Sequence, residues 1–182
     1  MRKLLILTLG VSSMLLATSP KTYINMKAVQ LIHTDNGTEQ DFEPTAFKWT
    51  VGHIFKEFDH VALGIEASAM LGVANDTKST VSSSTTGVYT NAKTEMDNLY
   101  NLNLKVLVPL TDNFMFSSSI GVSRAKMIST ATNYSSPNNW DNSLSYGAGI
   151  HYNILRDVSL EVDYMQYYKN LNGIEVGLGF KF

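Results

Sequence analysis

The chain ends in the stretch Ile174-Glu175-Val176-Gly177-Leu178-Gly179-Phe180-Lys181-Phe182, in which every even-numbered residue is apolar and every odd-numbered residue is charged or glycine. A period of two places successive side chains on opposite faces of a β-strand. The stretch therefore predicts a strand with one apolar face and one face that is polar or lined by glycine.

The same period recurs in seven further segments of the chain. The eight predicted strands cover residues 23–33, 46–55, 61–73, 98–108, 114–124, 143–154, 158–168 and 174–182. The fifth is the least regular, because Ser118 falls on its apolar face. Most of the segments approach the ~9–11 residues that a tilted strand needs to cross a bilayer. They exceed the ~5–6 residues usual in soluble proteins.

The connections alternate between long and short. The long polar links cover residues 34–45, 74–97 and 126–142, and the short links cover 56–60, 109–113 and 155–157. Outer-membrane barrels carry short turns in the periplasm and long loops outside. This pattern predicts that both chain termini are periplasmic, with the short link at 169–173 as the exception among the outer loops. The link at 74–97, rich in Ser and Thr, is expected to be mobile at its tip.

The composition excludes several other classes of protein. Charged residues make up 16% of the chain, against ~25% in an ordinary soluble domain. The mean hydropathy of -0.05 does not fit a bundle of membrane helices. Cysteine is absent, which excludes disulfides, thiolate zinc sites and lipidation at a cysteine. No basic stripe is present, so no nucleic-acid partner is predicted.

The first 19 residues have the layout of a secretory signal peptide. Arg2 and Lys3 form a positive start, Leu4–Ala17 is apolar, and small residues follow. The apolar run is shorter than the ~20 residues of a membrane-spanning helix, although an uncleaved anchor is the alternative. The predicted domains are therefore a signal peptide at 1–19 and a barrel at 20–182. The cleavage point stays open, because Pro20 disfavours a cut after Ser19.

Alternation alone fits either a soluble β-sandwich or a membrane barrel. A sandwich buries its apolar faces, whereas a membrane barrel turns them toward lipid. Long strands, polar faces rich in Gly, Ser and Ala, and aromatic residues near strand ends favour the barrel. The predicted fold is all-β: an eight-stranded antiparallel up-and-down transmembrane β-barrel.

The terminal strand resembles the C-terminal β-signal of outer-membrane proteins. Glu175, Gly177, Phe180 and Phe182 match that signal in place, and the resemblance implies recognition by the barrel-assembly machinery. The chain as a whole resembles the small outer-membrane barrel group that includes the OmpA barrel domain, OmpX and the opacity-type surface antigens. The likeness extends to the patch Ser145–Ile150. It implies a fold and an outer-membrane location, but a shared fold does not supply a function.

The strand register predicts charged side chains inside the barrel. The inward positions carry Lys27, Lys48, Lys105 and Lys181, together with Glu66, Glu161, Asp163 and Glu175. An eight-stranded barrel is just wide enough for side chains to fill it, and unpaired buried charges cost several kcal/mol each. We expect an ion-paired plug, with a narrow polar pathway for ions or small solutes as the alternative.

The sequence gives little support for a catalytic or a metal-binding group of residues. His151 is expected to face inward beside Glu161 or Asp163, but near the periplasmic end, where an outer-leaflet lipid hydrolase would not place its base. His33 lies at the outer rim without a serine and an acid fixed beside it by any motif. Asp35, Glu39 and Asp41 could attract calcium or bridge to lipopolysaccharide, although a solvated acidic loop is the commoner case. No metal or cofactor is predicted.

The function predicted from these features is that of a non-enzymatic surface protein of the bacterial outer membrane. The barrel would anchor loops for adhesion or envelope interaction, with Tyr89, Tyr134 and Trp140 as candidate contact residues. The expected partners are outer-membrane lipids and lipopolysaccharide, the assembly machinery, and host or environmental molecules at the loops. A small-solute channel and a lipid hydrolase are the alternatives.

Overall fold

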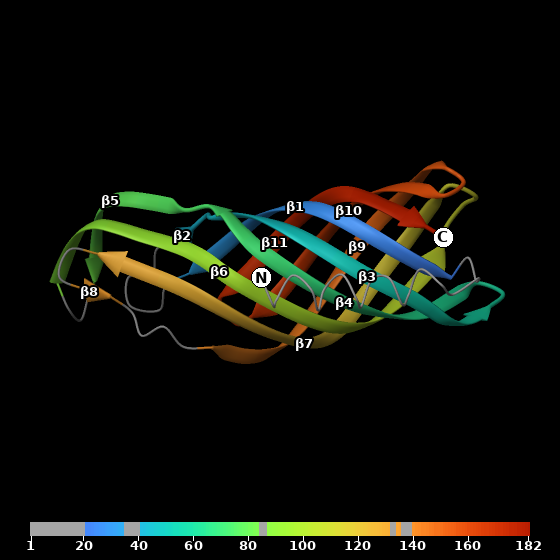
Figure 1. Cartoon of the computed structure of the whole chain (residues 1–182), viewed down its shortest axis with the longest axis horizontal. Helices are drawn as coiled ribbons and strands as arrows, with labels where there is room; N and C mark the ends of the chain where they lie inside the picture. The colour runs from blue at the N-terminus through green and yellow to red at the C-terminus, as the bar shows by residue number, and fades with distance from the viewer. Residues whose placement is uncertain (1–20, 35–40, 84–86, 132–133, 136–139) are drawn as a thin grey trace, which may run out of the picture.

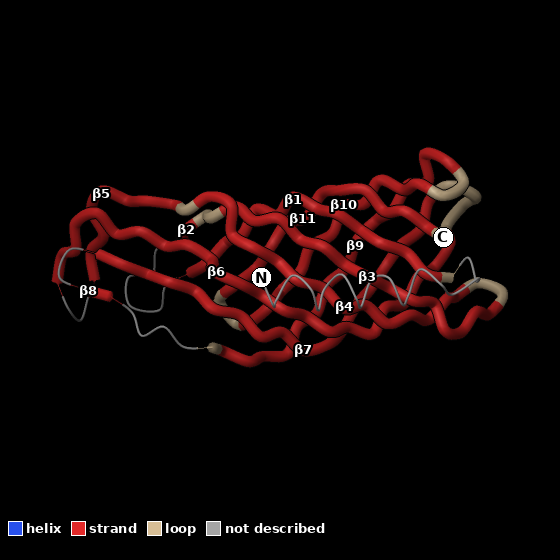
Figure 2. The backbone as a smooth tube through the Cα atoms, viewed as in Figure 1, coloured by secondary structure: helices blue, strands red, loops and turns tan. Residues whose placement is uncertain are grey.

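The computed structural model describes residues 21–34, 41–83, 87–131, 134–135 and 140–182 as one antiparallel sheet closed into a barrel (Figures 1 and 2). Its eight long strands are β1 (Thr22–Thr34), β3 (Thr45–Phe58), β4 (Val61–Ala74), β6 (Gly87–Pro109), β7 (Phe114–Ala131), β9 (Asp141–Leu155), β10 (Val158–Tyr168) and β11 (Leu171–Lys181). Each pairs with its neighbours in chain order, and β1 pairs with β11. The predicted eight-stranded up-and-down barrel is confirmed. The predicted signal peptide lies outside the described residues.

No helix in the described part of the chain has the length and apolar character needed to span a bilayer.

The seam between β1 and β11 closes the barrel and runs in register from Tyr23 opposite Lys181 to His33 opposite Leu171. Gly177 lies opposite Lys27 in this seam. A Cβ at Gly177 would collide with the carbonyl oxygen of Met26 and with Lys27 itself. Glycine is therefore needed here so that a lysine side chain can turn inward beside the neighbouring backbone.

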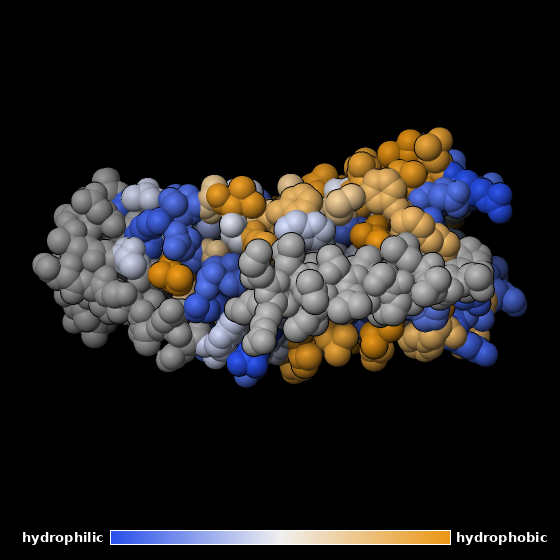
Figure 3. Space-filling view, viewed as in Figure 1, coloured by the Kyte–Doolittle hydropathy of each residue, from blue (hydrophilic) through white to orange (hydrophobic). Residues whose placement is uncertain are grey.

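The apolar face of the strands points outward. Leu104, Ile150 and Val176 are 55%, 52% and 46% exposed, whereas the polar residues that alternate with them are buried. Figure 3 shows apolar residues gathered over the middle of the barrel and hydrophilic residues at its two ends. This arrangement is that of a membrane barrel and not of a sandwich, in which these three side chains would pack together at the centre.

The two ends of the barrel differ. At one end, here called the terminal end, lie the start of β1, the end of β11 and three short turns at residues 59–60, 110–113 and 156–157. The backbone N–H of Phe182 donates to the carbonyl oxygen of Thr22 there, at 2.9 Å. The opposite end, here called the long-loop end, carries the long connections together with the short strands β2 (Asp41–Phe42) and β8 (Tyr134–Ser135).

The prediction of one long loop at 74–97 is wrong. β5 (Asp76–Ser83) pairs with the first part of β6, from Asp76 opposite Thr94 to Ser83 opposite Gly87. The span 74–97 is rich in Ser and Thr, a composition that suggests a loop. Its Thr, Val and Tyr residues nevertheless favour extended backbone once a partner strand is present. The expected mobile tip falls at residues 84–86, outside the described residues.

Two other links are also shorter than predicted. β7 continues to Ala131, which takes up part of the expected link at 126–142. β11 begins at Leu171, so the expected link at 169–173 is a turn of two residues, Lys169 and Asn170. Both differences lengthen the paired strands at the long-loop end.

Replacing Leu104 with Arg tests the outward orientation. Leu104 lies midway along the part of β6 that pairs with β4, and a charge there would enter hydrocarbon. We expect the free energy of unfolding in phospholipid vesicles, measured with urea, to fall by about 2–4 kcal/mol. Leu110→Arg, in a turn at the terminal end, is the matched control and should cost about 1 kcal/mol or less. Equal losses at the two positions would contradict the assignment of faces.

Candidate functional site

An apolar cluster fills the barrel interior near the long-loop end. Its buried members are Val29, Leu31, Ala46, Met70, Met96, Leu99, Ala125, Met165, Tyr167, Tyr168 and Leu171. This cluster was not predicted from the sequence, because the inner face of each strand was recognised by its polar residues. The period of two could have revealed it. Val29 and Leu31 follow the inward Lys27 by two and four residues on the same strand, so their side chains must also point inward.

Below this cluster lies a layer of buried ion pairs centred on Lys27. The Nζ of Lys27 is 2.6 Å from Oδ2 of Asp163, 2.8 Å from Oε2 of Glu161 and 3.8 Å from Oε2 of Glu175. Glu175 also accepts from Lys48 Nζ, at 2.8 Å and 3.0 Å to its two oxygens, and from the hydroxyl of Tyr167. One connected network therefore satisfies three carboxylates with two lysines.

A second ion pair lies beside that network. Lys105 Nζ is 2.8 Å from Oε1 of Glu66, and the hydroxyl of Tyr23 donates to the same oxygen at 2.9 Å. Lys181 is not part of either group: it is half-buried at the terminal end, 3.4 Å from Oδ1 of Asn153. The structure thus places seven of the eight predicted inward charges in the buried layer. These are three lysines and four carboxylates, which leaves a formal surplus of one negative charge (+3 and −4).

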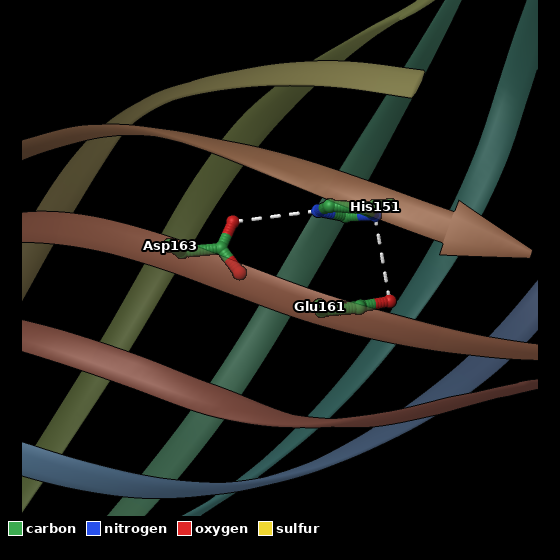
Figure 4. Close-up of side chains that lie close together, drawn as sticks. All are labelled: His151, Glu161 and Asp163. Atoms are coloured by element: carbon green, nitrogen blue, oxygen red, sulfur yellow. Dashed lines mark hydrogen bonds and ion pairs between the residues drawn. The ribbon is translucent and has the colours of Figure 1, made fainter. Parts of the chain in front are cut away.

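His151 lies between two of these carboxylates (Figure 4). Its Nδ1 is 3.5 Å from Oε1 of Glu161, and its Nε2 is 3.4 Å from Oδ1 of Asp163. The sheet register produces this arrangement, because His151 of β9 is directly opposite Glu161 of β10 and Asp163 is the next inward residue. Gly149 opposite Asp163 leaves the room, since a Cβ there would collide with the Asp163 carboxylate.

The hydroxyls near this triplet contact its acids. Ser117 Oγ donates to Oδ1 of Asp163 at 3.2 Å, and Ser159 Oγ donates to Oε1 of Glu161 at 3.1 Å. A nucleophilic serine needs contact with the imidazole that takes its proton, and among the described residues neither serine makes one. His33 lies at the other end, opposite Leu171 and Phe42 in the sheet.

A cavity of about 420 Å³ opens at the terminal end and is called the vestibule below. Its rim includes Glu57, Phe58 and Pro109, and its polar floor includes Lys105, His151 and Glu161. The interior therefore has three zones in series, which are the vestibule, the ion-paired layer and the apolar cluster.

The four residues of the terminal motif lie at different depths. Glu175 is buried in the ion-paired layer and Gly177 is in the seam. Phe180 lines the vestibule, and Phe182 is exposed at the terminal end. Their role as an assembly signal stays a prediction.

The predicted loop residues are described in part. Asp35 and Glu39, and the side chains of Tyr89 and Tyr134, lie outside the described residues. Asp41 accepts a hydrogen bond from Oγ1 of Thr34 at 2.6 Å. Trp140 stacks on Tyr100 with ring centroids 5.8 Å apart, and the guanidinium of Arg124 lies 5.1 Å from its ring centroid.

Comparisons with known proteins agree with this architecture. The family profile described as outer membrane protein beta-barrel domain matches residues 4–182. No curated protein matches the sequence. Among solved structures, the attachment invasion locus protein Ail of Yersinia pestis superimposes with a TM-score of 0.60 at 15% identity, covering 89% of this chain and 98% of that one.

Two further structures have the same fold. The outer membrane protein OprG of Pseudomonas aeruginosa has a TM-score of 0.56 at 14% identity and covers 89% of this chain and 96% of its own. The Neisserial surface protein A has a TM-score of 0.53 at 13% identity, with coverages of 90% and 98%. At these identities the likeness shows the fold alone.

Replacing Lys105 with Met tests the energetics of the buried layer. The substitution leaves the Glu66 carboxylate buried with the Tyr23 hydroxyl as its donor, and we expect the free energy of unfolding to fall by about 3–5 kcal/mol. Adding Glu66→Leu should restore most of the loss, because an apolar pair leaves no uncompensated charge. Lys21→Met breaks the exposed pair with Glu57 and should cost about 1 kcal/mol or less. Urea unfolding of the four proteins measures these differences.

Proposed function

Since this chain belongs to the outer-membrane protein β-barrel family, we propose that it is a non-enzymatic surface protein whose barrel anchors a binding platform at the long-loop end. In this proposal the terminal end faces the periplasm. The terminal motif is read by the barrel-assembly machinery, and lipids and lipopolysaccharide surround the apolar band.

The observation that carries the proposal is a β-ribbon formed by β5 and by the parts of β6 and β7 beyond the barrel. β6 pairs with β4 up to Asn98, and its earlier residues pair with β5 and with the end of β7. About ten residues of β6 thus extend past the barrel wall, which at ~3.3 Å per residue spans roughly 35 Å. Figure 1 shows these three strands running well beyond the other long strands at the long-loop end.

The filled interior supports anchoring in preference to conduction. The apolar cluster and the ion-paired layer lie one behind the other, and side chains such as Leu31, Leu99 and Tyr167 have no measurable exposure. An ion would have to displace both layers to cross. This arrangement weighs against the small-solute channel, which is the first alternative that the sequence predicts.

The charges at the long-loop end indicate the kind of ligand. A structure of Ail holds the heparin analogue sucrose octasulfate, a polyanion. Here the described residues mix acids with bases: Asp41, Glu43, Asp76, Glu95, Asp97 and Asp141 stand beside Lys78, Lys93, Arg124, Lys126 and Lys169. Lys93 pairs with Glu95 and Lys126 with Asp97, both at 2.7 Å. We therefore propose a ligand other than a sulfated polysaccharide.

Surface display and adhesion are tested together in a strain that does not adhere. An epitope inserted at residues 84–86 should react with antibody on intact cells. Deleting residues 78–93 should leave a barrel that shifts on a gel after boiling, while adherence to host cells falls to the level of the empty strain. Asp112→Ala, in a turn at the terminal end, is the control that should change neither readout. An epitope that reacts only in broken cells would contradict the proposal that the long-loop end faces the outside. Unchanged adherence after the deletion would contradict the proposal that the ribbon mediates adhesion.

Recordings in planar lipid bilayers test the filled interior. We expect no stepwise conductance from the folded barrel at moderate voltage, because two closed layers block the axis. A barrel that had been boiled before addition is the control for leakage caused by unfolded protein. Reproducible conductance steps with the folded protein would favour the small-solute channel over the anchoring function.

A further inference from the structure

The gap between His151 and Glu161 holds two facing acceptor atoms. Asp163 Oδ1 lies 3.4 Å from Nε2 of His151. In the tautomer with its N–H on Nε2, the imidazole donates to Asp163 and turns the lone pair of Nδ1 toward Glu161. Nδ1 and Oε1 of Glu161 then face each other across 3.5 Å. Two lone-pair atoms repel at this distance unless a cation lies between them. Tetrahedral zinc with bonds of about 2.0–2.2 Å separates neighbouring donor atoms by about 3.3–3.6 Å, which matches the gap.

Two more oxygens lie near Oε1 of Glu161, above Gly179 of β11. A Cβ at Gly179 would lie 2.6 Å from Oγ of Ser159 and 2.9 Å from Oδ1 of Asn25, and closer still to Oε1 of Glu161. The absence of a side chain at Gly179 keeps this space open. Glycine in a strand often marks such a close approach.

The amide oxygen of Asn25 is the independent sign of a missing partner. Asn25 is 1% exposed, and its Oδ1 is buried without a hydrogen-bond partner among the described residues. Its Nδ2 donates to Oε2 of Glu161 at 2.9 Å, which fixes the orientation of the amide. A buried acceptor that lacks a donor is costly, so an amide held in this way points to a bound species.

The donors can be reached from the vestibule. Asn25, His151, Ser159, Glu161 and Gly179 all line the vestibule, which opens at the terminal end. Asp163 lies behind His151 and is not part of the lining. The charged residues that line the vestibule are Lys105, Lys181, Glu57 and Glu161. Lys27 contacts only Oε2 of Glu161, at 2.8 Å, which leaves Oε1 for another partner.

We propose that His151, Glu161 and Asn25 bind a divalent transition-metal ion, zinc above all, at the floor of the vestibule. His151 Nδ1, Glu161 Oε1 and Asn25 Oδ1 are the protein ligands, and Ser159 or a water completes a tetrahedron. Asp163 is a positioning residue, as in the carboxylate–histidine–metal arrangements of known zinc sites. The mixed nitrogen and oxygen donors favour zinc over calcium and magnesium, which take oxygen ligands.

A proton on Nδ1 is the rival occupant of the gap, because a doubly protonated ring would also bridge the two acids. The two occupants differ in a measurable way. Zinc binds with fixed stoichiometry and displaces that proton, whereas a proton alone leaves no metal in the dialysed protein. ¹⁵N spectra of the His151 ring distinguish a metal-bound nitrogen from a protonated one.

The experiment uses the mature chain folded in detergent micelles, stripped with a chelator and desalted, and titrated calorimetrically with zinc chloride. We expect one zinc ion per chain and a shift of the His151 Nδ1 resonance, with magnesium and calcium failing to compete. His151→Gln should weaken zinc binding at least about tenfold, and His60→Gln, at an exposed position in a turn of the same end, should leave it unchanged.

Gly179→Ala provides a second arm in case His151→Gln fails to fold. The three atoms nearest to the added methyl are the ends of the Glu161, Ser159 and Asn25 side chains and not backbone, so the barrel should still fold and shift on a gel after boiling. The same methyl fills the space that the metal needs, so zinc binding should be lost. Absence of zinc binding in the parent protein, or equal binding in the folded Gly179→Ala variant, would overturn the proposal.

Discussion

The hydrogen bonding of the backbone is the constraint on which the rest of the structure depends. A strand in hydrocarbon finds no water, so each N–H and C=O must bond within the protein. The sheet meets this demand by closing β1 on β11, which leaves no free edge in the barrel wall. Closure also fixes the direction of every side chain, because the outer face must suit lipid and the inner face must fit a narrow axis. The narrow interior also explains two glycines of the wall. A Cβ at Gly177 would collide with Lys27, and a Cβ at Gly149 would collide with Asp163, so glycine at these positions lets both charged side chains fit inside.

A narrow closed interior turns charge placement into a packing problem. Desolvated ions are tolerable only when each has partners in good geometry, and here Lys27 contacts three carboxylates while the Tyr23 and Tyr167 hydroxyls complete the coordination of Glu66 and Glu175. The apolar cluster at the long-loop end then seals the axis without adding further charges. The ion-paired layer joins side chains from six of the eight long strands. The apolar cluster excludes water from the long-loop side of that layer.

Much of this architecture was predictable from the sequence, because one rule governs it. The period of two placed Leu104 and Val176 outward, and it placed Lys27 and Glu161 inward, once the membrane orientation was chosen. The strand extensions escaped prediction because the Ser- and Thr-rich composition of residues 76–83 suggested a loop. The apolar cluster and the vestibule escaped for a different reason. They depend on which residues of distant strands share a level along the axis, and that level is set by the stagger of the whole barrel. Asn25 and Gly179 have no local pattern that brings them to His151.

The seam has a consequence for how the molecule comes into being. Tyr23 pairs with Lys181, so the first and last strands of the barrel are adjacent. The wall cannot be completed until synthesis and export have delivered the final residues, and the chain entropy lost on joining these ends is that of a loop of nearly the full length. The barrel therefore cannot close before the chain reaches the membrane, and until then the apolar faces of its strands are not buried in lipid. This favours folding as a single late event over the strand-by-strand maturation open to proteins with local contacts.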